Sequence, residues 1–418
     1  MAYFLFAFYF IIFCWLLLRI RFTKEAGIQD RYLIGLFICK ILAGVVIGWV
    51  SLHLYDPHND YWDINREGFK EYQLLFNSPK EYFSNIFHSS YQDAYGGLFE
   101  SSNSYWNDLK NNILGKLVSI FDIFSGGNYY VNSLFFNFFI FFGHVALFKL
   151  FSSIYQNNKT LILIGCFLLP STLYFTSGIH KDGLVFLFVA LIAYFIYYMM
   201  KERKLLLFRT GAVLILLTLL FLVRNFVCIV LLPALIAWVI TVNLRTRAWI
   251  VFSTIYIISV IIFFSIHSVS SRIDPPAILT KRQLEFRQMG DAKTDIQLDS
   301  LRPNFSGYLD NLPQASDHVF LRPYIFELPS TLLLPMNIEL LIYQILLLLF
   351  IFFRRKNNTA TDSFIWVSIF FALTMFFIIG YLVPNLGTLV RYRSIFWPFL
   401  LIPILGRIDW QKLGFKSN

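Results

Sequence analysis

A short polar stretch, residues 55–63, places acidic and imidazole side chains directly after a long apolar run. The carboxylates are Asp56, Asp60 and Asp63, and the imidazoles at and just before the stretch are His53 and His58. The apolar run, residues 32–54, is long enough to cross a bilayer. A carboxylate at such a membrane exit can accept a proton from a hydroxyl group. The stretch is therefore predicted to be the acidic part of a reaction site at the membrane surface; the alternative is a solvated loop.

Basic residues in four other stretches are candidate ligands for a phosphate group. They are His180 and Lys181 in residues 170–183, Arg224 in the mostly apolar residues 207–240, Arg322 in residues 321–329, and Arg391 and Arg393 on either side of Tyr392. A guanidinium group can bind phosphate through two parallel hydrogen bonds, and an ammonium group acts as a point charge. Simpler interpretations stay open: a capped hairpin with a Lys–Asp pair, a turn between two helices, and an anchor at the membrane interface.

The composition is that of a membrane protein. Of the 418 residues, 57% are hydrophobic and only 14% are charged, whereas soluble domains carry about 25% charged residues. All four cysteines lie inside apolar segments, which argues against a disulfide framework or a CxxC metal site. Walker, HExxH and GxSxG motifs are absent, which disfavours nucleotide-driven, zinc-protease and hydrolase chemistry. Basic cytoplasmic loops account for the net charge of +10, so no nucleic-acid partner is predicted.

The apolar blocks predict an all-α polytopic fold with about eleven transmembrane helices. Eighteen Lys and Arg residues fall in the inner loops and tail and four in the short outer turns, which predicts the N-terminus outside and the C-terminus inside. Lys40, within the second span, is predicted to extend its ammonium group to the inner surface. The predicted spans are residues 3–19, 32–54, 131–150, 160–178, 184–200, 207–223, 225–242, 248–266, 328–353, 363–383 and 394–406.

Two long segments, residues 55–130 and 267–327, are predicted to lie outside the membrane. In the first, Ser78-Pro79 predicts the start of a helix. Apolar residues at three- and four-residue spacing predict an amphipathic helix over residues 106–124, which either lies on the membrane or packs against another outer helix. In the second, the prolines of residues 321–329 predict an extended entry into the next span.

This layout resembles the GT-C superfamily of integral-membrane glycosyltransferases. In that family an early span leads into a long outer loop, and acidic residues near the start of the loop serve the reaction. With residues 1–20 as an extra N-terminal helix, residues 55–130 correspond to that loop. Residues 170–183 and 321–329 are similar to stretches of bacterial surface-polysaccharide membrane proteins. The adjacent Asp-Glu pair of some members is absent, and Asp60 and Asp63 take its place.

The resemblance implies one integral-membrane domain, residues 1–418, in the cytoplasmic membrane of a bacterium. It implies sugar transfer from a polyprenyl-phosphate-linked donor to a glycan or lipid acceptor at the outer face. Asp60 is then the general base that takes the proton of the acceptor hydroxyl, with Asp56 or Asp63 as its neighbour or substitute. The basic residues named above hold the phosphate, and Tyr61 and Trp62 either stack on sugar rings or are buried. Membrane lipids are implied partners, a divalent cation stays open, and the oligomeric state is unknown.

Two other functions stay open at this stage. The residues around Tyr392 are also similar to outer-loop arginines of O-antigen-polymerase-like proteins, which polymerise or ligate lipid-linked glycans. The second alternative is a non-enzymatic transporter or flippase of lipid-linked glycans. A transporter predicts charged residues near the middle of several spans, whereas here the charges fall mostly at the outer ends.

Overall fold

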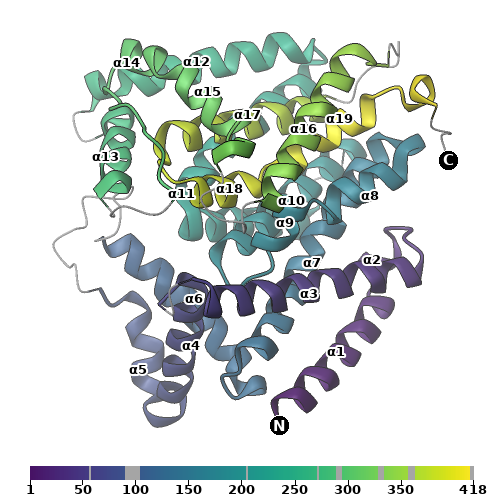
Figure 1. Cartoon of the computed structure of the whole chain (residues 1–418), viewed down its shortest axis with the longest axis vertical. Coiled ribbons are helices and arrows are strands. Elements are labelled where there is room, and N and C mark those ends of the chain that lie inside the picture. The colour runs from purple at the N-terminus through teal and green to yellow at the C-terminus, as the bar shows by residue number, and fades with distance from the viewer. Residues whose placement is uncertain are drawn as a thin grey trace. The chain divides into compact units, whose positions relative to one another are not determined.

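The computed structural model describes residues 1–55, 58–89, 104–203, 206–270, 273–288, 294–327, 334–355 and 363–414 (Figure 1). In these ranges the regular secondary structure is helical, and the only β-type pairs are two isolated bridges. Eight of the described helices are long and apolar enough to cross a membrane, or nine if a bent pair counts as one span. The chain is therefore an α-helical multi-pass membrane protein, as predicted. The eight are α1 (Ala2–Arg19), α3 (Asp30–His53), α7 (Tyr129–Ile154), α10 (Lys181–Glu202), α11 (Leu207–Leu244), α12 (Ala248–Val269), α16 (Leu334–Phe352) and α17 (Phe364–Leu382).

The predicted count of eleven spans is not confirmed, because the observed helices differ from the predicted spans in three places. Residues 160–178 form two short helices, α8 (Lys159–Phe167) and α9 (Pro170–Phe175), because Pro170 begins a new helix. The two spans predicted on either side of Arg224 both fall within α11, whose backbone is non-helical at that residue (φ −150°, ψ 84°). The last span is a pair, α18 (Leu386–Ser394) and α19 (Trp397–Arg407), bent by 61°.

The chain divides into two compact units, which we describe separately. Unit 1 comprises Met1–Leu150, Cys166–Met199 and Leu205–Asn225, and unit 2 comprises Phe151–Gly165, Met200–Lys204 and Phe226–Asn418. The single integral-membrane domain expected from the sequence stays a prediction.

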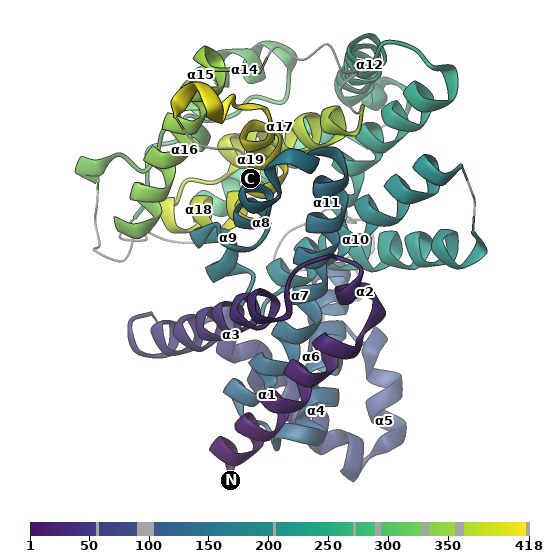
Figure 2. The ribbon, with the colours of Figure 1, turned by 90° about the vertical axis from the view of Figure 1, so that its right-hand side faces the viewer.

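The described part of the first segment predicted to lie outside contains three α-helices, α4 (Asp60–Asn77), α5 (Pro79–Ser84) and α6 (Tyr105–Ser125), which lie together in Figures 1 and 2. The predicted helix start at Pro79 is confirmed. The predicted amphipathic helix is also confirmed as α6, and it ends at Gly126, which has a left-handed φ of 63°. Since α6 packs mainly against α4, the second of the two alternatives for this helix is correct.

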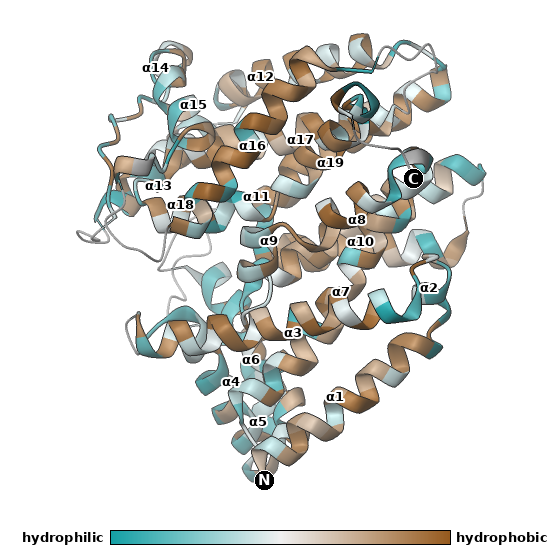
Figure 3. Cartoon of the chain, turned by 45° about the vertical axis from the view of Figure 1, so that its right-hand side comes forward, coloured by the Kyte–Doolittle hydropathy of each residue, from teal (hydrophilic) through white to brown (hydrophobic). Residues whose placement is uncertain are grey.

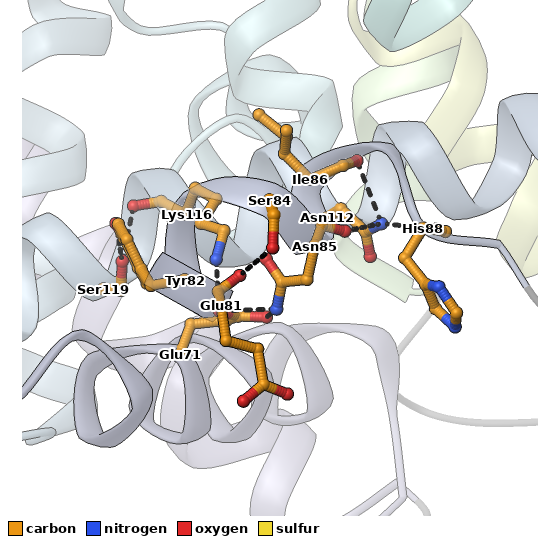
Figure 4. Close-up of polar contacts among 10 residues, drawn as sticks. All are labelled: Glu71, Glu81, Tyr82, Ser84, Asn85, Ile86, His88, Asn112, Lys116 and Ser119. Atoms are coloured by element: carbon orange, nitrogen blue, oxygen red, sulfur yellow. Dashed lines mark hydrogen bonds and ion pairs between the residues drawn. The ribbon is translucent and has the colours of Figure 1, made fainter. Parts of the chain in front are cut away.

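Hydrogen bonds and an ion pair connect α5 and the turn after it to α4 and α6 (Figure 4). The Lys116 ammonium of α6 bonds to Glu71 of α4 and lies 3.6 Å from the ring centroid of Tyr82. Asn85 donates a hydrogen bond to Glu71 at 3.0 Å. The Asn112 amide donates to three carbonyl groups in residues 85–88. These contacts hold the outer helices together as a folded subdomain.

The helices of this subdomain are more hydrophilic than the membrane-spanning helices. Figure 3 shows α1 and α12 as mostly hydrophobic and α4 and α5 as largely hydrophilic. The long helix α3 connects α2 (Arg21–Lys24) and the short chain segment after it to the polar turn before α4. This arrangement places the start of α4 directly at the end of a membrane-spanning helix.

The described part of the second segment predicted to lie outside is also helical. It contains α13 (Pro275–Gln288), α14 (Phe305–Asp310) and α15 (Leu312–Phe320). Gln283 ties α13 to its surroundings, since its side chain donates to the carbonyls of Asp299 and Tyr381 and accepts from the N–H of Leu301. The predicted extended entry around residues 321–329 instead includes a 3₁₀ turn, Ile325–Glu327, and residues 328–333 lie outside the described ranges.

The prediction that Lys40 extends to the inner surface is wrong. Its residue is only 1% exposed, and its ammonium group donates a hydrogen bond to the Thr176 hydroxyl at 2.6 Å. A partner on another segment therefore fixes the side chain inside unit 1.

The predicted topology can be checked by cysteine labelling in a background without the four native cysteines. We expect a membrane-impermeant maleimide added from outside to modify Lys80→Cys and Asp310→Cys, which are exposed residues of the two outer segments. It should miss Lys24→Cys and Lys201→Cys, which are exposed residues of predicted inner loops. Labelling in the reverse pattern would overturn the orientation and every outer-face assignment built on it.

Candidate functional site

Asp60 is the first residue of α4, and a cap at Asn59 fixes its place. The Asn59 side chain accepts hydrogen bonds from the backbone N–H groups of Tyr61 and Trp62 at 3.2 and 3.4 Å. Its amide group donates to the carbonyl of Ser51 in α3 at 2.8 Å. The cap thus joins the end of α3 to the start of α4. Residues 60–63 therefore start a helix and do not form the solvated loop that was the alternative, and a helix N-terminus stabilises a carboxylate.

The two aromatic residues after Asp60 pack against other side chains, with Tyr61 buried and Trp62 half-buried. Tyr61 is 3% exposed, and its ring centroid lies 5.3 Å from that of His180. A Cβ atom on Gly178 would lie 2.5 Å from the Tyr61 ring, so the close approach requires glycine. The Trp62 indole donates to the carbonyl of Gly48 at 3.0 Å and stacks on Tyr129. Of the two alternatives for these aromatics, the structure shows packing.

His180 lies between two carboxylates. Its side chain is 0% exposed; Nε2 lies 3.3 Å from Oδ2 of Asp60, and Nδ1 lies 2.9 Å from Oδ2 of Asp182. The backbone N–H of Asp182 also donates to Nδ1 at 3.3 Å. A ring protonated on both nitrogens can donate to both carboxylates, whereas a neutral ring can donate to only one of them. The side chain of Asp60 is 55% exposed, so one end of this row reaches the surface.

The other end of the row is a buried ion pair. Arg224 Nη2 lies 2.6 Å from Oδ1 of Asp182, with 6% of the arginine side chain and 0% of the aspartate side chain exposed. Asp182 lies in the first turn of α10, where the helix dipole also stabilises a negative charge. Arg224 occupies the non-helical break of α11. Buried charges need such partners, which explains why both are tolerated here.

The structure thus brings four side chains into one row in unit 1: Asp60, His180, Asp182 and Arg224. An exposed carboxylate that contacts a buried imidazole is held in one orientation by it. Such a carboxylate can exchange protons with a bound hydroxyl group. Sequence reasoning named three of the four and treated Asp182 only as part of a Lys–Asp pair. The basic residue next to it, Lys181, is half-buried at the first position of α10.

The other acidic candidates have different surroundings. Asp63 pairs with Arg66 one turn further along α4, and its Oδ1 lies 3.9 Å from Nδ1 of His58. It is therefore already neutralised by a neighbouring guanidinium group. Asp56 lies outside the residues that the structure describes. Of Asp60 and Asp63, the two acidic candidates that the structure describes, Asp60 is the one that contacts His180.

Two of the predicted phosphate ligands in unit 2 have protein partners. Arg322 lies 3.0 Å from Asp317 and 3.5 Å from Glu327, with about a quarter of each side chain exposed. Arg393 is 2% exposed and donates to the carbonyls of Val319 and Arg322 at 3.0 and 2.6 Å. Arg393 thus fixes the backbone on which Arg322 is carried.

The third, Arg391, is half-buried, with its guanidinium carbon 5.2 Å from the Tyr392 ring centroid. The pairing of an arginine with a tyrosine fits the predicted interfacial anchor as well as a ligand.

Metal ligands are not assembled in the parts of the chain that the structure describes: there, no group of three or more His, Cys, Asp or Glu residues could hold a metal ion. A divalent cation therefore stays an open prediction from the sequence.

No family model, curated protein or solved structure matches the chain.

Proposed function

We propose that the chain transfers a sugar from a polyprenyl-phosphate-linked donor to an acceptor at the outer face of a bacterial cytoplasmic membrane. One observation carries the proposal: the exposed carboxylate of Asp60 lies directly at the end of the α3 span and contacts the buried His180. A lipid-linked substrate lies at that depth, because its chain is in the bilayer and its sugar is in water.

Asp60 is the general base in this proposal. The acceptor hydroxyl attacks the anomeric carbon, its proton passes to Asp60, and the bond from the anomeric carbon to the phosphate oxygen breaks with both electrons on the oxygen. His180 orients the carboxylate through Nε2, and Asp182 orients the ring through Nδ1. The charge that develops on the phosphate needs a fixed cation.

Two of the predicted phosphate ligands take a different role in this scheme. His180 is fully buried and Arg224 is bonded to Asp182, so both support Asp60 rather than touch the phosphate. Lys181 remains the proposed phosphate ligand of unit 1. Arg322, Arg391 and Arg393 stay predictions from the sequence, and the pairing of Arg322 and the burial of Arg393 leave Arg391 as the candidate to test first.

We expect Arg391→Ala to abolish transfer while the protein still inserts and expresses. Arg391→Lys should restore only part of the rate, because an ammonium group lacks the planar fork of guanidinium. The measurement is transfer of labelled sugar in membranes that contain equal amounts of each variant. Near-normal transfer by the alanine variant would make Arg391 an interfacial anchor.

The function itself is tested in proteoliposomes that contain the purified chain, an acceptor extract and labelled polyprenyl-phosphate sugars. Transfer from such a monosaccharide donor supports the proposal. Elongation only when polyprenyl-diphosphate oligosaccharides are supplied would favour the polymerase or ligase alternative. Movement of labelled lipid between leaflets without any new glycosidic bond would replace both with a flippase.

A further inference from the structure

The two halves of α6 have opposite patterns of burial. In residues 105–112, Leu109 is buried and the polar residues are half-exposed or exposed, as in a helix that faces water. From residue 113 to the end of the helix the pattern is reversed. Every polar residue there is buried, namely Lys116, Ser119, Asp122 and Ser125. Every exposed or half-exposed residue there is apolar, namely Ile113, Leu117, Ile120, Ile123 and Phe124.

The buried polar side chains of this second half contact other helices. Lys116 bonds to Glu71 of α4 (Figure 4). Asp122 accepts a hydrogen bond from the Asn132 amide of α7 at 2.6 Å. The contacts with the rest of the protein therefore take up the polar side of the helix, and the apolar side faces outward.

The outward side is a continuous stripe. Ile113, Leu117, Ile120 and Phe124 follow one another at spacings of four, three and four residues, so they lie on one face. Ile120 and Phe124 are 48% and 47% exposed. Single exposed apolar residues are ordinary, but a stripe without a charged residue marks a contact surface.

Ring contacts place this half of α6 beside a membrane-spanning helix. The ring centroid of Phe121 lies 6.0 Å from that of Phe139, and the centroid of Phe124 lies 5.7 Å from that of Phe135. Phe135 and Phe139 lie about 9 and 15 Å along the axis of α7 from its first residue, Tyr129. Phe139 is 47% exposed on a helix that crosses the membrane, so it faces lipid. The apolar side of α6 thus continues the lipid-facing surface of α7.

We propose that residues 113–125 of α6 are embedded in the bilayer beside α7, with the stripe of Ile113, Leu117, Ile120 and Phe124 against acyl chains. Helix α6 is not one of the eight described helices that could cross the membrane, so it lies within one leaflet. In the predicted topology this is the outer leaflet. A second copy of the chain is the other occupant of such a stripe, and the contact with the lipid-facing Phe139 favours lipid.

An embedded α6 sets the height of the outer helices above the membrane. Helix α4 packs along α6 and begins with Asp60. Gly126 and Gly127, with left-handed φ values of 63° and 85°, form the tight turn that joins α6 to α7. The inference does not depend on sugar transfer. It also explains how a helix rich in charged residues, α4, is held close to the bilayer.

The experiment is electron paramagnetic resonance of the full chain in lipid nanodiscs. One nitroxide label is attached to a single cysteine in a background without the four native cysteines. Collisions with oxygen, which concentrates among acyl chains, and with a neutral nickel chelate, which stays in water, report what surrounds the label. At Ile120→Cys and Phe124→Cys we expect the oxygen collision rate to exceed the nickel rate.

Asn111→Cys and Gln73→Cys are the matched controls, since they are exposed residues of the first half of α6 and of α4. At both we expect the nickel rate to exceed the oxygen rate. A higher nickel rate at residues 120 and 124 overturns the proposal, because the stripe then faces water. Low rates for both reagents there also overturn it, because the stripe is then covered by protein. The four labels lie on exposed side chains and report independently of transfer activity, so an inactive chain gives the same test.

Discussion

Asp60→Asn is expected to lower sugar transfer about 10²-fold or more, the size expected for loss of a general base. Asparagine keeps the shape of the side chain and can still face Nε2 of His180, but it cannot accept the proton of the acceptor hydroxyl. Donor binding should stay near the parental level, because in the proposed scheme the carboxylate acts on the acceptor. The measurement is the initial rate of transfer together with the affinity for the lipid-linked donor.

Asp63→Asn is the matched control, since Asp63 lies in the same turn of α4 but pairs with Arg66 instead of His180. It should cost less than Asp60→Asn, and so should Asp56→Asn. If Asp60→Asn transfers sugar at the parental rate while one of the others is inactive, the site stands and the choice of base is wrong. If all three remain active, the acidic stretch has no part in catalysis.

Local signals in the sequence predicted part of this site. Pro79, Gly126 and the apolar spacing of α6 are short-range features, and the helix boundaries they predict are confirmed. The start of α4 was also readable, because Asn59 followed by two acidic residues in the first turn is a cap pattern.

Contacts between distant segments could not be read in the same way. Asp182 and Arg224 are 42 residues apart, and no local pattern pairs them. One general rule points to the pair, namely that an arginine inside an apolar run requires a buried carboxylate. Lys40 is a different case: its long, flexible side chain can extend to the membrane surface or turn into the protein, and the residues packed around it determine which.

The last prediction concerns the stability of the Asp182–Arg224 pair. Asp182→Asn leaves the Arg224 guanidinium buried without its counter-charge, and Arg224→Met does the same to the Asp182 carboxylate. Each single change should therefore lower the free energy of unfolding by about 3–5 kcal/mol. The double variant should recover most of that loss, since replacing both partners leaves no buried charge unpaired. Thermal unfolding in one detergent gives the order of the four proteins.

Arg302→Met is the matched control for the single variants. Arg302 lies 2.7 Å from Asp310, nearly the distance of the buried pair, but the two side chains are 64% and 57% exposed. An exposed pair contributes only about 0.2–1 kcal/mol, so this variant should unfold close to the parental temperature. Equal stability of all the variants would show that burial does not decide the strength of the Asp182–Arg224 contact.

Transfer by the double variant separates the two roles of the pair. If Asp182 only neutralises Arg224, activity should return together with stability. We expect stability to return without activity, because asparagine at position 182 cannot offer the carboxylate that lies 2.9 Å from Nδ1 of His180. The ring then loses the partner that directs Nε2 at Asp60. Full activity of a stable double variant would contradict this role and leave Asp60 acting without support from Asp182.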